Sequence, residues 1–297
     1  MKYVITGGAG NISKPLTEIL LQGGHQVTVI GRNAANLQSL TDAGAVAAIG
    51  SVEDIPFLTR TFAGADAIYT MVPPVHATTD WKAHIGKIGK NYAAAIQESG
   101  VKYVVNLSSV GAHLAEGVGP VSGLYRAEQA LNTLTGVAIL HLRPPYFYNN
   151  LLANIGMIQG MGMIGANFAV AEKKFPLVAP ADIAVVAAEA LQSLSFSGHS
   201  VRYLASDIVS TDEIAAVLGA AIGKPDLTWT LFTDEQALGG MLQAGLPEEM
   251  AKNYAEMNHA IQTGDMYADF FKQVPEKFGK TKLTDFAKIF AQVYNGK

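Results

Sequence analysis

The sequence predicts an α/β fold in which a doubly wound parallel sheet is followed by a smaller, mostly helical C-terminal lobe. In the first half of the chain, short runs rich in β-branched and aromatic residues alternate with segments of helical periodicity. This alternation is typical of a parallel sheet with helices on both faces. The composition agrees, because 49% of the 297 residues are hydrophobic and can bury a sizeable core.

Six strands and four helices are predicted in this half. The strands are Lys2–Thr6, Gln26–Ile30, Val46–Ile49, Ala67–Met71, Val101–Leu107 and Val137–His141. The helices are one that carries Ile12, Leu16, Ile19 and Leu20 on one face, then Ile55–Phe62, Asp80–Ser99 and about Ser122–Leu134. We expect the connections between neighbouring parallel strands to be right-handed.

After Pro144 the alternation stops, and a stretch rich in Asn, Gly and Met follows. Within it, Met157–Ile164 fits a core helix with glycine breaks better than an adaptable pocket wall. Beyond it we predict a helix at Ala181–Leu194, capped by Asp182, and a strand at Val201–Ala205. Further helices are predicted at Thr211–Ile222, Asp234–Ala244, Pro247–Thr263 and Leu283–Tyr294. We therefore divide the chain into residues 1–150, which form the sheet domain, and residues 151–297, a smaller lobe of which part returns to the sheet.

Composition excludes several classes of function. The net charge of −4 gives no reason to expect nucleic acid as a partner. Cysteine is absent, which rules out disulfides and thiolate chemistry, and the seven histidines are scattered, so no metal site is expected. No signal peptide is visible and no apolar run approaches the roughly 20 residues that span a bilayer, so we expect a cytoplasmic protein without a membrane segment. The low charge content of 15% is compatible with an oligomer interface, such as that of a homodimer, or with a large apolar pocket.

A glycine-rich turn follows the first predicted strand. Gly7, Gly10 and Ser13 have the spacing G-x-x-G-x-x-S, and a helix begins at once. Glycines allow the tight turn and the close approach of a pyrophosphate, and the helix N-terminus offers free N–H groups. Ser13 stands where such loops usually carry a glycine, and because serine is small we expect only a slight shift. The turn predicts a dinucleotide site; the alternative is an ordinary glycine-rich turn.

The end of the second predicted strand indicates which dinucleotide would bind. An NAD-selective fold usually places Asp or Glu there, about 20 residues after the glycines, on the ribose 2′-hydroxyl. Gly31 and Arg32 stand there instead. Because an arginine pairs with a 2′-phosphate through two parallel hydrogen bonds, we predict NADP(H) rather than NAD(H). The alternative is that Arg32 is a solvated surface charge.

Five stretches of the chain, ITGGAGNISKPL, VIGRN, FAGADAIYTMVPP, GVKYVVNLSSVGAH and LRPPYFYNNL, resemble the NmrA-like group of atypical short-chain dehydrogenases. The resemblance covers most of the chain, continues through PADIAVVAAEAL and is most specific in the first 150 residues. It implies a Rossmann-type fold that binds NADP(H) across the C-terminal ends of the strands. Members of the group include reductases of quinones, azo dyes and triphenylmethane dyes, and regulators that bind the cofactor without turnover.

The resemblance also implies, position by position, which residues contact the cofactor. At the pyrophosphate and the adenosine phosphate these are Gly7, Gly10, Asn11, Ile12, Arg32 and Asn33. Beside the ribose and the nicotinamide they are Met71, Val72, Pro73, Ser108, Pro145 and Tyr146.

The catalytic pattern of this superfamily is present only in part. Typical short-chain dehydrogenases use a serine and a Tyr-x-x-x-Lys pair, in which the lysine lowers the pKa of the tyrosine that exchanges a proton with the substrate. Ser108 and Tyr125 are the candidates here, but Gln129 holds the lysine position, and a neutral amide cannot lower the phenol pKa. Tyr125 is therefore either catalytic or a packed aromatic. His113 is either a proton donor or a loop histidine at the surface.

Two functions stay open. The first is an NADP(H)-dependent reductase that transfers hydride to a small, flat, electron-poor substrate of the quinone, azo-dye or triarylmethane-dye type, since such acceptors need little acid–base help. Tyr146 and Tyr148 would then stack on the substrate or simply pack. The second is a non-catalytic NADP(H)-binding redox sensor that acts through a protein partner. Gln129 and the extended Met- and Gly-rich segment keep this alternative open. An isomerase ranks lower because the Tyr–Lys pair is incomplete.

Overall fold

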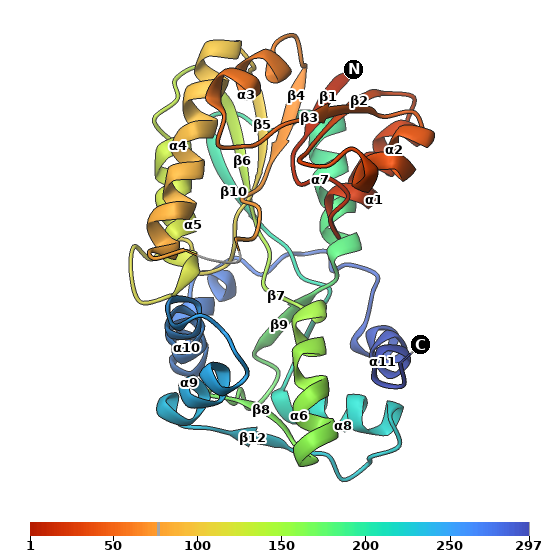
Figure 1. Ribbon diagram of the computed structural model, residues 1–297, viewed down its shortest axis with the longest axis vertical. Helices are drawn as coiled ribbons and strands as arrows, with labels where there is room; N and C mark the ends of the chain where they lie inside the picture. The colour runs from red at the N-terminus through yellow and green to blue at the C-terminus, as the bar shows by residue number, and fades with distance from the viewer. Residues whose placement is uncertain (76–77, 297) are drawn as a thin grey trace.

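The computed structural model describes residues 1–75 and 78–296. Its upper part in Figure 1 is built on a seven-stranded sheet, and its lower part consists of helices and two small sheets. All pairs in the large sheet are parallel, in the order β10-β6-β5-β4-β1-β2-β3. Its strands are β1 (Lys2–Ile5), β2 (Gln26–Gly31), β3 (Val46–Ile49), β4 (Ala67–Thr70), β5 (Tyr103–Leu107), β6 (Ala138–Arg143) and β10 (His199–Tyr203).

The chain starts in the middle of this sheet and winds outward in both directions, which confirms the predicted doubly wound topology. From β1 it proceeds through β2 to β3 at one edge, and then returns to β4 on the other side of β1. The strand order reverses between β1 and β4, so a crevice forms outside the carboxyl ends of these two strands. In folds of this kind, that crevice is where ligands bind.

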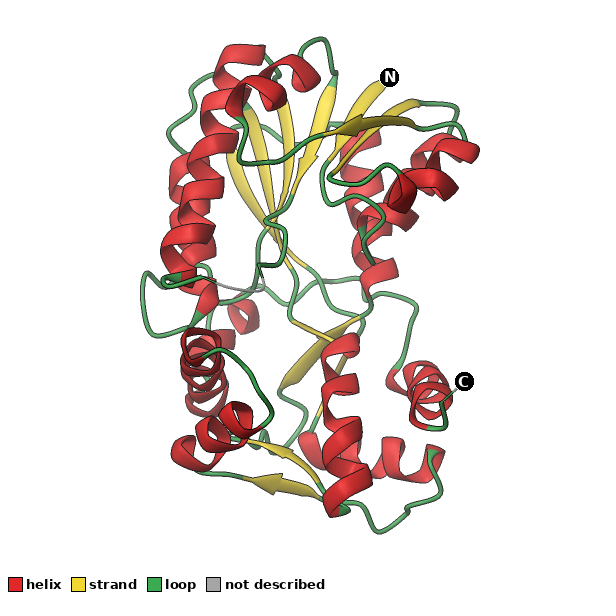
Figure 2. Cartoon of the chain, viewed as in Figure 1, coloured by secondary structure: helices red, strands yellow, loops and turns green. Residues whose placement is uncertain are grey.

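Helices cover both faces of the large sheet (Figure 2). Ile5 of β1 belongs to the core under α1 and α7, whereas its neighbour Val4 faces the core under α3 and α4, as the alternation of a strand requires. The helices on the first face are α1 (Ser13–Gln22), α2 (Gln38–Asp42) and α7 (Pro180–Ser193). Those on the second face are α3 (Ile55–Phe62), α4 (Trp81–Ser99) and α5 (Pro120–Leu131).

The lower part contains more strand than the sequence predicted. A three-stranded sheet has the order β11-β9-β7, and β12 pairs with β8. These strands are β7 (Tyr146–Phe147), β8 (Ile164–Ala166), β9 (Phe175–Val178), β11 (Asp207–Val209) and β12 (Trp229–Leu231). Strands of two to four residues carry no readable alternation, which is why the sequence missed them. The helices here are α6 (Ile155–Met161), α8 (Thr211–Ala221), α9 (Asp234–Gln243), α10 (Glu248–Thr263) and α11 (Leu283–Tyr294).

Four 3₁₀ segments complete the described part of the chain, and two of them border the site described below. They are η1 (Ala35–Leu37), η2 (Tyr148–Asn154), η3 (Asp265–Tyr267) and η4 (Phe270–Lys272).

The predicted role of Asp182 as a helix cap was wrong. Helix α7 begins earlier, at Pro180, and its N-cap is Ala179, which makes no side-chain cap hydrogen bond. The Asp182 carboxylate instead accepts a hydrogen bond from the Ser206 hydroxyl (2.6 Å) and another from the backbone N–H of Thr281 (3.1 Å). Asp182 therefore fastens the segment before α11 to the first turn of α7.

A chain of buried hydrogen bonds crosses three strands of the large sheet. The Thr70 hydroxyl donates to Asn106 Oδ1 (2.9 Å), Asn106 Nδ2 is 3.1 Å from His141 Nδ1, and His141 Nε2 is 3.0 Å from Asn132 Oδ1. Burial lowers the pKa of His141 to about 4. The imidazole is therefore neutral near pH 7, and it joins β6 to the C-terminal end of α5.

Candidate functional site

The turn after β1 adopts a conformation that requires glycine. Gly7 and Gly8 have φ values of 96° and 57°, in the left-handed region that other residues enter only with strain. The N–H of Gly10 donates to the carbonyl of Gly7 (3.1 Å), which closes the turn. A Cβ on Gly7 would collide with the hydroxyl of Ser13. The loop therefore has no space for a side chain at this position.

Ser13 ties the start of α1 to the end of β1. Its hydroxyl is buried and donates to the carbonyl of Thr6 (2.8 Å). The N-cap of the helix is Ile12, which is buried and makes no side-chain cap, and no acidic residue stands in the first turn. Asn11, just before it, is exposed. The positive end of the helix dipole is thus free to meet an anion, so the loop fits a pyrophosphate group.

Met71 connects this loop to the end of β4. Its backbone is held on both sides, because its N–H donates to the Thr6 hydroxyl (2.9 Å) and its carbonyl accepts from the Tyr92 hydroxyl (2.7 Å). Its side chain lies against the glycine loop, with the sulfur 3.2 Å from where a Cβ of Gly7 would be. The structure therefore brings the start of the MVPP run next to the glycines.

Arg32 lies at the end of β2 with an exposed side chain. Among the described residues, no side-chain hydrogen bond or ion pair engages it. A hydrogen bond from Lys87 (3.0 Å) lowers the pKa of Glu53, and the nearby charge of Arg32 adds to this effect. Asn33 accepts the N–H of Ala35 through its side chain (2.9 Å), which shapes the turn into η1. The Arg32 guanidinium is thus available to a phosphate.

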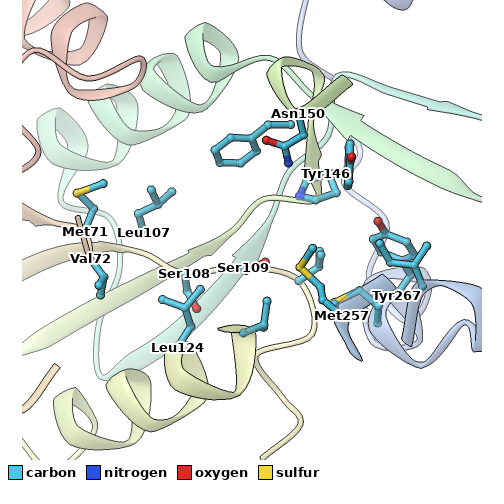
Figure 3. Close-up of a pocket in the computed structure, with 16 residues that line it drawn as sticks. Met71, Val72, Leu107, Ser108, Ser109, Leu124, Tyr146, Asn150, Met257 and Tyr267 are labelled. Atoms are coloured by element: carbon cyan, nitrogen blue, oxygen red, sulfur yellow. The ribbon is translucent and has the colours of Figure 1, made fainter. Parts of the chain in front are cut away.

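A cavity of about 310 Å³ opens at the carboxyl ends of β4 and β5 (Figure 3). Its size lies at the lower end of the range for small-molecule sites, and its lining is mainly apolar. Five of the predicted cofactor residues line it: Met71, Val72, Ser108, Pro145 and Tyr146. The neighbouring Pro73 is half-buried. The structure thus gathers residues from three separate segments into one site, while their contacts with a cofactor stay predictions.

The side of the cavity away from Met71 and Val72 comes from the lower part of the chain, as Figure 3 shows for Met257 and Tyr267. Helix α10 contributes Met257 and Ile261, and η3 contributes Met266 and Tyr267. Sequence reasoning missed all four. Their spacing fits one face of an amphipathic helix and the turn after it, a pattern that does not distinguish a pocket wall from ordinary core.

Ser108 presents an unpaired hydroxyl at this cavity. The residue is 5% exposed, and its Oγ has no hydrogen-bond partner, although its backbone N–H donates to Leu142 (2.8 Å). Buried polar atoms are usually paired, so an orphan on a cavity wall is a group that a ligand can satisfy. Ser108 therefore offers a ligand an unpaired hydroxyl on the cavity wall.

The other two predicted catalytic side chains lie elsewhere. Neither Tyr125, half-buried on α5, nor His113 belongs to the described residues that line the cavity. Burial lowers the pKa of His113, and its Nδ1 is buried without a partner. Gln129, one turn after Tyr125, is exposed. The catalytic roles of Tyr125 and His113 stay predictions.

The two tyrosines that follow Pro145, Tyr146 and Tyr148, differ in their surroundings. Tyr148 is fully buried and stacks on Phe286, with ring centres 5.2 Å apart, so it belongs to the core. Tyr146 lines the cavity and also contacts Phe175 (5.1 Å). Of these two, Tyr146 is therefore the one placed to meet a ligand.

Two further observations limit the kind of site. Among the described residues, no group of His, Asp and Glu side chains is arranged to hold a metal ion. No helix in the same residues is long and apolar enough to cross a membrane.

Comparisons with known proteins show what the chain is similar to. It is 26% identical over 293 residues to an NAD(P)H azoreductase of Xenophilus azovorans, covering 98% of both chains. A structure of an Escherichia coli NADPH-dependent quinone oxidoreductase with NADPH superposes with a TM-score of 0.81 at 21% identity, over 97% of this chain and 99% of the other. The Citrobacter triphenylmethane reductase with NADP(H) gives 0.77, also at 21%, with 97% and 99% covered.

At this level of identity, the two solved structures establish a shared fold. The family assignment comes from the sequence profile of the NmrA-like family, which matches residues 2–287 and so includes both the glycine loop and the wall of the cavity. The chain belongs to the NmrA-like family.

Proposed function

We propose that the protein is an NADP(H)-dependent reductase that transfers hydride to a small, flat, electron-poor acceptor such as a quinone, an azo dye or a triarylmethane dye. The observation that carries this proposal is the position of Met71, which touches the glycine loop and lines the apolar cavity. A dinucleotide held by the loop would therefore reach the cavity with its other end. The azoreductase, quinone reductase and dye reductase among the similar proteins support this class of activity.

The cofactor would lie along residues from both ends of the crevice. Gly7, Gly10 and the start of α1 would hold the pyrophosphate, and Arg32 would pair with the 2′-phosphate. Met71 and Val72 would lie beside the ribose and the nicotinamide. NADPH, when bound, supplies the hydride.

The side chains of the cavity suit an acceptor that needs little acid–base catalysis. A flat acceptor would lie against Tyr146 and the methionines, because methionine adapts to varied shapes. With a quinone as acceptor, the hydroxyl of Ser108 would donate a hydrogen bond to the carbonyl oxygen that becomes negative as hydride arrives. With Gln129 exposed and Tyr125 outside the lining, the proton would come from water. We further propose that residues 151–297 supply the substrate side of the site, through α10 and η3.

The test has two stages. NADPH binding is measured first, by the change in nicotinamide fluorescence on titration. Loss of nicotinamide absorbance is then followed with a panel of quinones and dyes. We expect binding, and acceptor-dependent oxidation with at least one class. NADPH binding without oxidation across the panel would contradict the reductase and favour the alternative, a non-catalytic redox sensor that acts through a protein partner.

A matched pair of variants sharpens the test. Ser108 and Ser109 both line the cavity, but only Ser108 carries the buried, unpaired hydroxyl. We expect Ser108→Ala to lower kcat by about 10²-fold, the usual effect of removing one donor to a developing oxyanion, with NADPH affinity retained. Ser109→Ala should behave like the wild type. Equal kcat values for the two variants would remove Ser108 from the mechanism.

A further inference from the structure

We propose that a buried charge network centred on Arg143 positions the substrate wall of the cavity, which makes Arg143, Tyr203 and Asp269 positioning residues of this site. The inference rests on the proposed function, because it concerns how the acceptor is held. None of the three residues lines the cavity itself. Each acts through a segment that does.

Arg143 is the last residue of β6 and stands two residues before Pro145, at the cavity. Its guanidinium forms a two-pronged ion pair with Glu128 of α5: Nε donates to Oε1 (3.0 Å) and Nη2 to Oε2 (2.6 Å). Both side chains are buried, with exposed fractions of 9% and 2%. Glu128 lies one helical turn after Leu124, which lines the cavity. The pair therefore fixes α5 against the sheet at the level of the site.

The same guanidinium reaches two more parts of the cavity wall. Nη2 also donates to the carbonyl of Ala112 (3.3 Å), in the loop that continues from Ser108. Nη1 donates to the Tyr203 hydroxyl (3.0 Å), which in turn donates to Asp269. Nη1 lies 3.7 Å from the Asp269 carboxylate itself. One arginine thus joins α5, the serine loop, β10 and the segment after η3.

The segment anchored by Asp269 contains part of the cavity wall that the sequence did not predict. Met266 and Tyr267 stand three and two residues before it, respectively, and both line the cavity. The segment also touches the serine loop directly, because Gly111 (φ 82°) packs so closely on Met266 that a Cβ there would collide with its sulfur. A displacement of Asp269 would therefore shift both the Met266–Tyr267 segment and the loop that contains Ser108 and Gly111.

The burial and ion pairing of each charged side chain indicate which residue of the network can be substituted without unfolding the protein. Burial alone would lower the pKa of Arg143, but the hydrogen bonds that it donates to Glu128, and the charge of that carboxylate, raise the pKa above its ordinary value. Burial, with the hydrogen bond to Asp269, raises the pKa of Tyr203 to about 12, so this hydroxyl keeps its proton. Replacing Arg143 would leave Glu128 buried and unpaired, a large loss of stability. Asp269 is 23% exposed, and neutralising it leaves the Arg143–Glu128 pair intact.

The experiment therefore uses Asp269→Asn and Tyr203→Phe. Glu248→Gln is the matched control, because it removes a carboxylate from the start of α10. Among the described residues, Glu248 forms only an exposed ion pair with Lys252. Three measurements are made for each variant. They are the dissociation constant of NADPH, the KM and kcat for an acceptor that the wild type reduces, and the dissociation constant of 2-naphthol. This flat two-ring molecule accepts no hydride, so it reports on the wall even without turnover.

We expect the two network variants to raise the acceptor KM and the 2-naphthol dissociation constant about 10-fold, since small displacements in a site have effects of this order or more. NADPH affinity should change less than about 2-fold, and Glu248→Gln should match the wild type. Unchanged KM and 2-naphthol affinity would overturn the inference, as would an equal loss of NADPH affinity, which indicates general damage. If the wild type reduces no acceptor, the proposed reductase fails while the 2-naphthol measurement still decides the inference. Failure of the wild type to bind 2-naphthol would overturn the inference as well.

Discussion

Replacing Gly7 with alanine is the sharpest perturbation of the glycine loop. Gly7 adopts a φ of 96°, and its missing Cβ leaves just enough space for the Ser13 hydroxyl. Gly44, at the end of α2, has nearly the same φ of 105°, but no atom lies within 4 Å of where its Cβ would be. The two alanine variants therefore carry the same backbone strain, and only one of them carries the collision.

The expected effects follow from this difference. The strain of a left-handed residue costs about 1–2 kcal/mol and applies to both variants. The collision in Gly7→Ala adds about 1–3 kcal/mol, the usual cost of overpacking, because Met71 on the other side is also within 3.2 Å. We expect Gly44→Ala to lose about 1–2 kcal/mol of unfolding free energy and Gly7→Ala about 2–5 kcal/mol. Only Gly7→Ala should weaken NADPH binding.

Urea unfolding and NADPH titration measure both effects. The double variant Gly7→Ala/Ser13→Ala removes the colliding hydroxyl and should regain part of the lost stability, although the Thr6 carbonyl then loses its partner. The reasoning is refuted if Gly7→Ala binds NADPH as tightly as the wild type and loses no more stability than Gly44→Ala.

Three further predictions concern separate parts of the chain. Arg32→Ala should reduce the preference for NADPH over NADH by about 10-fold or more, and an unchanged ratio of the two affinities would show that Arg32 is only a surface charge. Tyr125→Phe should retain most of the turnover, because Tyr125 lies outside the cavity lining; a loss of kcat with unchanged NADPH affinity would restore it as a catalytic residue. The folded-state pKa of His141, about 4, lies below its ordinary 6.5, so the unfolded chain takes up the proton first as the pH falls. The free energy of unfolding should therefore decline as the pH falls from about 6.5 toward 4, and the loss should be about 2 kcal/mol at pH 5. In urea unfolding, His141→Gln should lack this part of the pH dependence.

The sheet and the glycine loop were predictable because their signals are local. The strands of the first half and the helices α1, α3, α4 and α5 form from contiguous patterns, and the loop between β1 and α1 contains its own glycines; the short helix α2 was not predicted. The clustering of Met71, Ser108 and Tyr146 was also accessible, because the ends of neighbouring parallel strands must meet at one edge of the sheet.

The second wall of the site was not predictable from the sequence. Met257 and Tyr267 are more than 100 residues from Tyr146, and only the fold of the lower part brings them to the cavity. The same holds for the pairing of Arg143 with Glu128 and Asp269. Burial and ion pairing depend on which elements pack together, and no local pattern encodes that. The homodimer and the cytoplasmic location stay predictions.

The central claim is that one site binds NADPH at the glycine loop and passes its hydride to an acceptor in the apolar cavity. A single-turnover experiment tests it most directly. The protein is mixed with less than one equivalent of NADPH, a quinone is added without oxygen, and the nicotinamide absorbance and the hydroquinone are quantified together. The account predicts one hydroquinone for each NADPH consumed, at a rate that falls in Ser108→Ala. NADPH that stays bound and unoxidised in the presence of every acceptor would contradict it.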